Sequence, residues 1–193
     1  NFMKKGFTLI ELLVVIAILA VLMSVVVVTI NPAEMLKKTR DTKRISDLDA
    51  LRTALNLYVT DQGNLGNVTS TNCYSHVSFT PGVSGCTGVT TVNGGGSQAV
   101  DSTGWIPINF ATITSGSPLS ALPVDPKVVT ATTDTGPGGW HAYVFKGSTS
   151  TVTFKLMANM ESAYYSGTSS NSVENTDGGA SPEVYEVGSD LNL

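Results

Sequence analysis

Reactive side chains are scarce in this chain of 193 residues. It contains two cysteines and two histidines, and only 13% of its residues are charged. His76 has no companions at metal-ligand spacing, and His141 fits a structural or surface position. The sequence also lacks a phosphate-binding loop, a nucleophile elbow and an oriented Cys–His pair. We therefore expect a protein that is not an enzyme and that has no catalytic residue, metal ion or cofactor.

The two cysteines lie close together in the chain. Cys73 and Cys86 enclose 12 residues, among them Pro81, Gly82 and Gly85. A pair that closes a short loop in an otherwise cysteine-free chain predicts a disulfide formed in an oxidising compartment. Loop-closure entropy gives such a link about 3 kcal/mol of stabilisation. The alternative is two unrelated buried thiols.

Charge is distributed unevenly along the sequence. Residues 1–52 carry a net charge of +3, whereas the rest of the chain carries −7. A basic front on an acidic, threonine-rich body fits docking at a membrane better than binding of nucleic acid by the body. A nucleic-acid partner is therefore not implied.

One long apolar run covers residues 7–30 and contains a single charge, Glu11. As a helix it is about 36 Å long, enough to cross a hydrocarbon core of ~30 Å. Lys4 and Lys5 precede it, which predicts a cytoplasmic N-terminus and an outward body. The run exceeds the apolar core of a secretory signal and lacks a clean cleavage site after it. A plain anchor explains the length but not Glu11, because an ionised carboxylate without a partner costs about 2–3 kcal/mol near the centre of the lipid and less near an end.

Residues 6–11 (GFTLIE), with two lysines before them, resemble the processing site of type IV prepilins and secretion pseudopilins. The resemblance implies that a prepilin peptidase cuts between Gly6 and Phe7, that Phe7 is N-methylated, and that the apolar helix is retained. Glu11 becomes the fifth residue of the mature chain and pairs with the α-amine of a neighbouring copy's Phe7. Such a pair acts as a register device, since the two charges match at one stagger only.

The dipeptide Asn31-Pro32 interrupts the apolar run. Pro32 removes a helical hydrogen bond and disfavours helical geometry at Asn31, so we expect a kinked but continuous helix in the isolated precursor. The alternative is a true break, with Asn31 as the N-cap of a new helix and Pro32 in its first position.

An amphipathic helix is expected to continue to Gly63, a natural C-cap. Its apolar residues recur every three or four positions, and a sheet should cover them: Ile45, Leu48, Leu51, Leu55 and Tyr58. A basic stretch precedes them: Lys37, Lys38, Arg40, Lys43 and Arg44. This stretch is either a contact for lipid headgroups or neighbouring subunits, or a solvated helix face, and we favour the solvated face.

The rest of the chain predicts a loop-rich body with a small antiparallel sheet. Residues 64–120 are rich in Gly, Ser, Thr and Asn and indicate a long ordered loop with short strands. Apolar and polar residues alternate over 151–156, which predicts a half-buried strand. We expect it to form a hairpin with 140–145 through a loop at 146–150, and we expect a last strand at 184–187.

This body also resembles pilins and pseudopilins, more loosely. Residues 122–126 (LPVDP) are similar to the family's Leu-Pro-x-Asp-Pro element, which precedes a Tyr-bearing strand, here at Tyr143, and residues 154–161 are similar to its strand that ends in Leu-Glu. Three features depart from the family. Lys127 and Val128 stand where major secretion pseudopilins carry Trp-Gly, and the cysteines lie outside the usual C-terminal pair. The carboxylates available to a calcium ion form no recognisable loop: Asp125, Asp134 and Asp177.

Together these features predict an α+β, type IV pilin-like fold, with a long N-terminal helix packed on a small antiparallel sheet. The expected segments are a leader at 1–6, an assembly helix at 7–30, an amphipathic helix at 31–63 and a head at 64–193. The resemblance implies a structural subunit that crosses the membrane once and then joins copies of itself in a helical surface filament, with the help of a prepilin peptidase and an assembly platform. The alternatives are a pseudopilin of a secretion or DNA-uptake system, and a monomeric membrane-tethered binding module.

Overall fold

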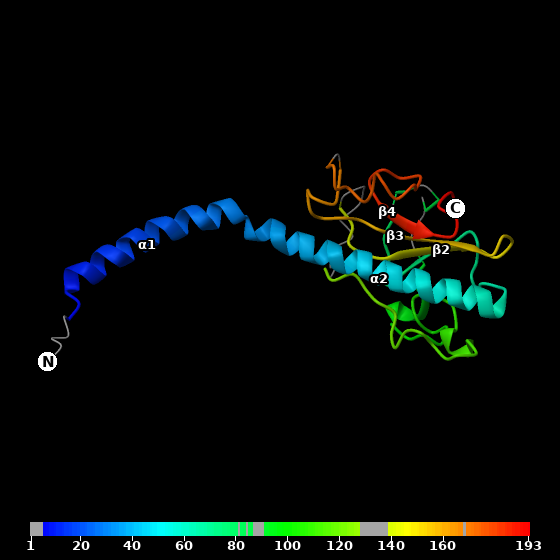
Figure 1. Cartoon of the computed structure of the whole chain (residues 1–193). Coiled ribbons are helices and arrows are strands. Elements are labelled where there is room, and N and C mark those ends of the chain that lie inside the picture. The colour runs from blue at the N-terminus through cyan, green and yellow to red at the C-terminus, as the bar shows by residue number, and fades with distance from the viewer. Residues whose placement is uncertain (1–5, 81, 84, 87–90, 128–138, 168) are drawn as a thin grey trace. The chain divides into compact units, whose positions relative to one another are not determined.

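The computed structural model describes residues 6–80, 82–83, 85–86, 91–127, 139–167 and 169–193, without the side chains of 27–30. The chain divides into two compact units, Asn1–Leu36 and Lys37–Leu193, which we describe separately. Two helices come first in the chain, and a four-stranded sheet is assembled from segments far apart in the sequence (Figure 1). The α+β class expected from the sequence is confirmed.

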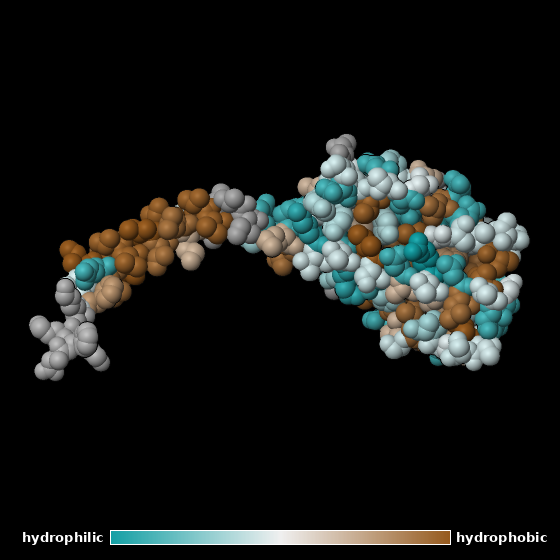
Figure 2. All heavy atoms as spheres, viewed as in Figure 1, coloured by the Kyte–Doolittle hydropathy of each residue, from teal (hydrophilic) through white to brown (hydrophobic). Residues whose placement is uncertain are grey.

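Helix α1 (Leu9–Ile30) is apolar on all sides. Its large apolar side chains from Leu9 to Val26 are between 46% and 81% exposed, and Figure 2 shows the hydrophobic surface that they form. Over Leu9–Val26 the helix is long and apolar enough to cross a membrane. A surface of this kind is stable only when lipid or other protein covers it.

The expected kinked but continuous helix is not what the structure contains. Helix α1 ends at Ile30, Asn31 adopts a left-handed conformation (φ 45°, ψ 76°), and a separate helix α2 (Pro32–Gln62) follows. The Asn31 carbonyl accepts hydrogen bonds from the backbone N–H groups of Glu34 and Met35, and its side chain accepts a second one from Glu34 at 3.4 Å. The alternative, a new helix capped by Asn31 with Pro32 in its first position, is therefore the correct one, because proline lacks only an N–H that a first turn leaves unpaired.

In the head, strands β1 (Cys73–Ser75), β2 (Val144–Ser148), β3 (Thr153–Ala158) and β4 (Tyr185–Gly188) form one antiparallel sheet in the order β1-β2-β3-β4. The predicted hairpin is present as β2 and β3, joined by residues 149–152 and paired so that Val144 lies opposite Met157. Its first strand begins at Val144 and not at Trp140 as expected, since residues 140–143 lie in the core without a ladder partner.

Both faces of the sheet are buried. On one face, Phe145, Phe154 and Leu156 pack with the apolar stripe of α2 and with residues before and within the short helical turn η2 (Phe110–Thr112). Of the five residues expected in that stripe, Ile45 is half-buried. The other four are buried: Leu48, Leu51, Leu55 and Tyr58. Helix α2 ends as expected before Gly63, whose N–H bonds the Val59 carbonyl.

A second cluster covers the other face of the sheet, where Val144 and Met157 contact Trp140 and the cysteine loop. Cys73 and Cys86 are joined by a disulfide, as predicted. The strand at β3 was expected to be half-buried, and this was wrong. Lys155, on its polar side, is 0% exposed and pairs with the equally buried Glu186 on β4 at 3.0 Å. The cysteine loop and the C-terminal segment pack over this side of the sheet. Alternation of apolar and polar residues within one strand does not predict such packing.

Candidate functional site

The start of α1 holds the residues that the sequence singled out. Thr8 is the N-cap, and its side-chain oxygen accepts a hydrogen bond from the Glu11 N–H at 3.4 Å. Glu11 Oε2 accepts in return from the Thr8 N–H at 2.8 Å and from the Thr8 hydroxyl at 2.7 Å. This reciprocal capping box places the carboxylate over the first turn, at the helix end where the backbone dipole favours negative charge.

Oxygen Oε1 of Glu11 accepts no hydrogen bond from the residues that the structure describes, because both Thr8 donors bond Oε2. Around the carboxylate lies an apolar hollow lined by Phe7, Ile10, Val14 and Val15. Spacings of three and four residues put these side chains on one helix face. The site is therefore a half-satisfied carboxylate on a surface that is otherwise apolar.

Gly6 and Phe7 precede the helix and are both exposed, Phe7 by 80%. A Cβ atom built on Gly6 would meet nothing within 4 Å. The fold therefore places no steric demand for glycine at this position. Lys4 and Lys5, expected to hold the N-terminus on the cytoplasmic side, lie outside the described residues.

The expected solvated face is wrong for Arg44, which is buried, whereas Lys43 in the same stretch of α2 is exposed. Arg44 is 0% exposed and donates two hydrogen bonds to Asp125, at 2.7 and 2.8 Å. It donates further bonds to Asp41 at 2.7 Å and to Glu161 at 2.6 Å. Arg40 forms a two-pronged pair with Glu161 at 2.9 and 2.7 Å. Two arginines and three carboxylates thus form one ion cluster inside the head.

Backbone groups complete this ion cluster. The Asp41 carboxylate accepts hydrogen bonds from the N–H groups of Glu161 at 2.9 Å and Ser162 at 2.8 Å, and Asp125 accepts from the N–H of Lys127. The cluster ties α2 both to residues 122–126 and to the chain that follows β3. Asp125 is therefore both a turn cap and an ion-pair partner.

The protonation behaviour of the ion cluster follows from these contacts. Burial raises the pKa of Glu161, but hydrogen bonds from Arg40 and Arg44 outweigh it and lower the value from 4.5 to about 2. Burial lowers the pKa of His141, against the attraction of Glu161. Asp47 lies on α2, beyond the ion cluster, and accepts a hydrogen bond from the Tyr143 hydroxyl at 2.8 Å. Burial and the negative charge of Asp47 raise the pKa of Tyr143.

The sequence did carry a signal for the ion cluster. Arg44 stands four positions before Leu48, and Asp41 stands three before Arg44, so both extend the apolar stripe of α2 toward its start. The stripe expected from the sequence runs through Ile45 instead. Arginine is the cation best suited to buried pairs, so its charge alone does not place Arg44 on the surface.

Among the residues that the structure describes, no group of three or more His, Cys, Asp or Glu lies where it could hold a metal ion. Asp134, considered as a calcium ligand, lies outside the described residues. His76 is packed edge-on against Trp105 and Tyr143, at centroid distances of 6.2 and 6.4 Å. Both histidines are thus placed among packed side chains in the head.

Comparison with protein families identifies a motif at the N-terminus. Residues 1–27 match the prokaryotic N-terminal methylation motif. The chain carries the signature of type IV pilins and pseudopilins. This signature supports a precursor of the pilin or pseudopilin type, and the apolar N-terminal helix indicates a membrane-anchored form. No curated protein and no solved structure matches this chain significantly.

Proposed function

We propose that this protein is a structural subunit of a type IV pilus-like cell-surface filament. The observation that carries the proposal is Glu11, the one charged residue in the apolar run 7–30, at a fixed offset from Gly6 within a matched methylation motif. A surface module tethered by a helix needs length and hydrophobicity in that helix. It does not need a carboxylate within the apolar run, which costs about 2–3 kcal/mol near the bilayer centre and less near an end when it is unpaired.

The precursor inserts with its N-terminus in the cytoplasm and its head outside. Prepilin peptidase then cuts between Gly6 and Phe7, and Phe7 is N-methylated. Two observations support this position for cleavage. Gly6 is exposed, and the fold has room for a side chain there. The presence of glycine at this position is therefore more simply explained by recognition by the processing enzyme.

The assembly platform then packs the α1 helices of successive copies together. Side chains that already lie in lipid gain packing and not hydrophobic energy from this step, so association depends on shape and on polar contacts. The exposed apolar surface of α1 supplies the contact area, and Glu11 supplies the polar contact.

In the proposed pair, the α-amine of a neighbouring copy's Phe7 donates to Glu11 Oε1. The Thr8 donors hold Oε2, so the capping box persists while the second oxygen takes the amine. Because the amine is freed only by cleavage, assembly is restricted to processed chains. A shift of one turn leaves both charges unpaired in an apolar surrounding.

The test replaces Glu11 by Ala and by Gln, with Ser24→Ala as a matched control. Ser24 is the other polar side chain well inside the span, and its hydroxyl bonds the Val21 carbonyl of its own helix at 2.7 Å. Both Glu11 variants should remain inserted, cleaved and folded, yet lose most surface filaments, whereas Ser24→Ala keeps them. Normal filaments in Glu11→Ala would remove this residue from the mechanism.

Electron microscopy with antibody labelling distinguishes the role of the assembled subunit. Long labelled surface fibres support the pilus proposal. Short fibres confined to the cell envelope would instead identify a pseudopilin of a secretion or DNA-uptake system. An uncleaved chain that never forms a fibre would identify a monomeric tethered binding module.

A further inference from the structure

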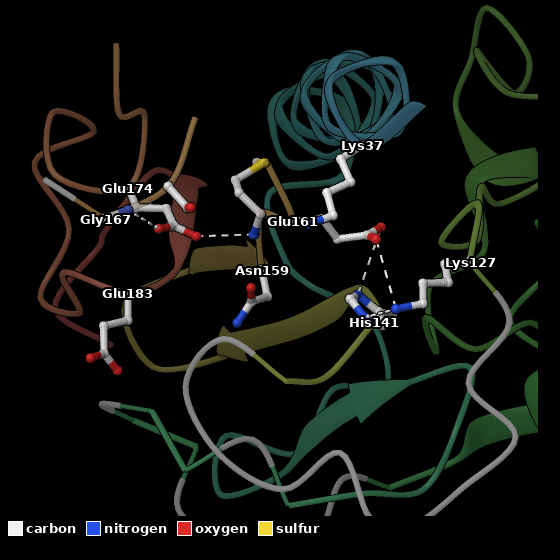
Figure 3. Close-up of a pocket in the computed structure, with 10 residues that line it drawn as sticks. Lys37, Lys127, His141, Asn159, Glu161, Gly167, Glu174 and Glu183 are labelled. Carbon is white, nitrogen blue, oxygen red and sulfur yellow. Dashed lines mark hydrogen bonds and ion pairs between the residues drawn. The ribbon is translucent and has the colours of Figure 1, made fainter. Parts of the chain in front are cut away.

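The head contains a cavity of about 410 Å³ that the filament proposal does not use. Figure 3 shows it between the start of α2, the end of β3 and the segment before β4, with Asn159 between the His141–Lys127 pair and Glu174. A volume of this size is that of a small-ligand site and far exceeds the ~30 Å³ of a single water molecule.

Asn159 provides the hydrogen-bonding groups that would select a ligand in this cavity. It directly follows β3, lines the cavity and is 1% exposed. Neither its amide nitrogen nor its amide oxygen has a hydrogen-bond partner in the part of the chain that the structure describes. Leaving both groups buried and unpaired is destabilising, so a native protein retains such a side chain where something else bonds it.

Three of the other polar side chains that line the cavity, Glu174, Glu161 and Lys127, already have partners and are therefore held in place. Glu174 accepts hydrogen bonds from the backbone N–H groups of Met160 at 2.9 Å and Gly167 at 3.2 Å. Glu161 is neutralised by the arginines of the ion cluster. The Lys127 ammonium bonds His141 Nε2 and lies 3.7 Å from Glu161, with 46% of its side chain exposed. The cavity thus presents an unpaired amide beside a fixed, accessible cation.

We propose that this cavity binds an extended peptide segment that carries an acidic side chain. In an extended chain the N–H and C=O of one residue point to the same side, as in a strand pair whose opposite residues exchange both bonds. The Asn159 side chain directly follows β3 and carries one acceptor, Oδ1, and one donor group, Nδ2. These two groups can bond the N–H and C=O of one peptide residue, as the backbone of a further strand residue would. An adjacent acidic side chain then reaches Lys127.

A peptide explains the cavity better than a free anion or a sugar. A free anion could accept from Lys127 and from the Asn159 NH2, but it has no donor and would leave the Asn159 amide oxygen unpaired. Sugar sites commonly stack rings on aromatic side chains, and none of the described residues that line this cavity is Phe, Tyr or Trp. The inference does not depend on filament assembly.

The test measures binding of capped tripeptides to the full chain in detergent micelles by calorimetry. One peptide has a central aspartate, and its counterpart has asparagine in the same position. N-acetylglucosamine is the control, because it carries a secondary amide on a sugar and not on a peptide. We expect the aspartate peptide to bind most tightly. Absence of binding by either peptide, or preference for N-acetylglucosamine, would overturn the proposal.

Variants locate the binding. Asn159→Leu should weaken the peptide at least about tenfold, because two hydrogen bonds are lost. Its melting temperature should be unchanged or higher, since an unpaired buried amide is replaced by an apolar group of similar shape. Asn56→Leu, at an exposed position on α2, is the matched control and should bind normally. Undiminished binding by Asn159→Leu contradicts the proposal.

A second variant keeps the test decisive if Asn159→Leu does not fold. Lys127 is half exposed, so Lys127→Gln should leave the head intact. It should abolish the preference for aspartate over asparagine while both peptides still bind. A preference that persists in this variant would show that Lys127 does not read the acidic side chain.

Discussion

Replacing Arg44 by Met should destabilise the head strongly, although Arg44 lies far from the proposed assembly site. The substitution places an apolar side chain of moderate size there and removes one buried charge and its four hydrogen bonds to carboxylates. Asp41 keeps two backbone N–H donors, and Glu161 keeps Arg40. Asp125, which is 4% exposed, keeps only the N–H of Lys127 among the bonds described and bears most of the loss.

Breaking a buried pair in this way costs about 3–5 kcal/mol, because a charge stays buried without compensation. For a domain of this size each kcal/mol lowers the melting temperature by roughly 2–4 °C, so the expected fall is about 6–20 °C. Tryptophan fluorescence of the full chain in micelles reports it directly. Trp105 and Trp140 are the only tryptophans and are both buried in the head.

Arg52→Met provides the matched control on the same helix. Arg52 pairs with Asp49 at 3.0 Å, with both side chains nearly half exposed, and an exposed pair contributes about 0–1 kcal/mol. Adding Asp125→Asn to Arg44→Met should restore at least half of the lost stability by removing the orphaned charge. The reasoning is refuted if Arg44→Met is no worse than Arg52→Met, or if Asp125→Asn brings no recovery.

Two further predictions concern the head. Glu161 has a folded pKa of about 2 against an ordinary 4.5, so its contribution is complete above pH 4.5 and is lost as the pH falls toward 2. Acid unfolding should therefore steepen in this window, and Glu161→Gln should remove that step from the pH titration. Reducing the Cys73–Cys86 disulfide should cost about 2–4 kcal/mol and lower the melting temperature by about 4–16 °C. An unchanged melting temperature in fully reduced protein would contradict this.

The helices could be predicted because their signals are local. An uninterrupted apolar run, a stripe at helical spacing and a glycine at the end define α1 and α2 from neighbouring residues alone. The break at Asn31 is one of two outcomes that the local sequence allows. Proline in the first position suits both a kinked and a restarted helix, and the left-handed conformation of Asn31 decides between them.

The ion cluster could not be assigned from local pattern, because its partners are remote in the chain. Arg44 meets Asp125 81 positions later and Glu161 117 positions later. The sequence resemblance had marked residues 122–126 and 154–161 as recurring elements without giving them a role. The structure supplies the role, since both elements carry the carboxylates that neutralise Arg44.

The buried polar side of β3 was missed for a related reason. Alternation along a strand shows which side chains share a face, but not what covers that face. Lys155 is covered because the cysteine loop and the C-terminal segment return to the sheet, and Glu186 supplies its counter-charge. Asn159 had no local signal at all, because an unpaired amide is visible only once its surroundings are known.

The most direct test of the filament account is the mass of the protein's N-terminal peptide, taken from surface fibres and from the membrane of the same cells. The account predicts that fibre subunits begin at N-methylated Phe7 and retain α1, while longer chains occur in the membrane alone. Functional molecules that still carry residues 1–6, or fibre subunits that lack α1, would contradict it.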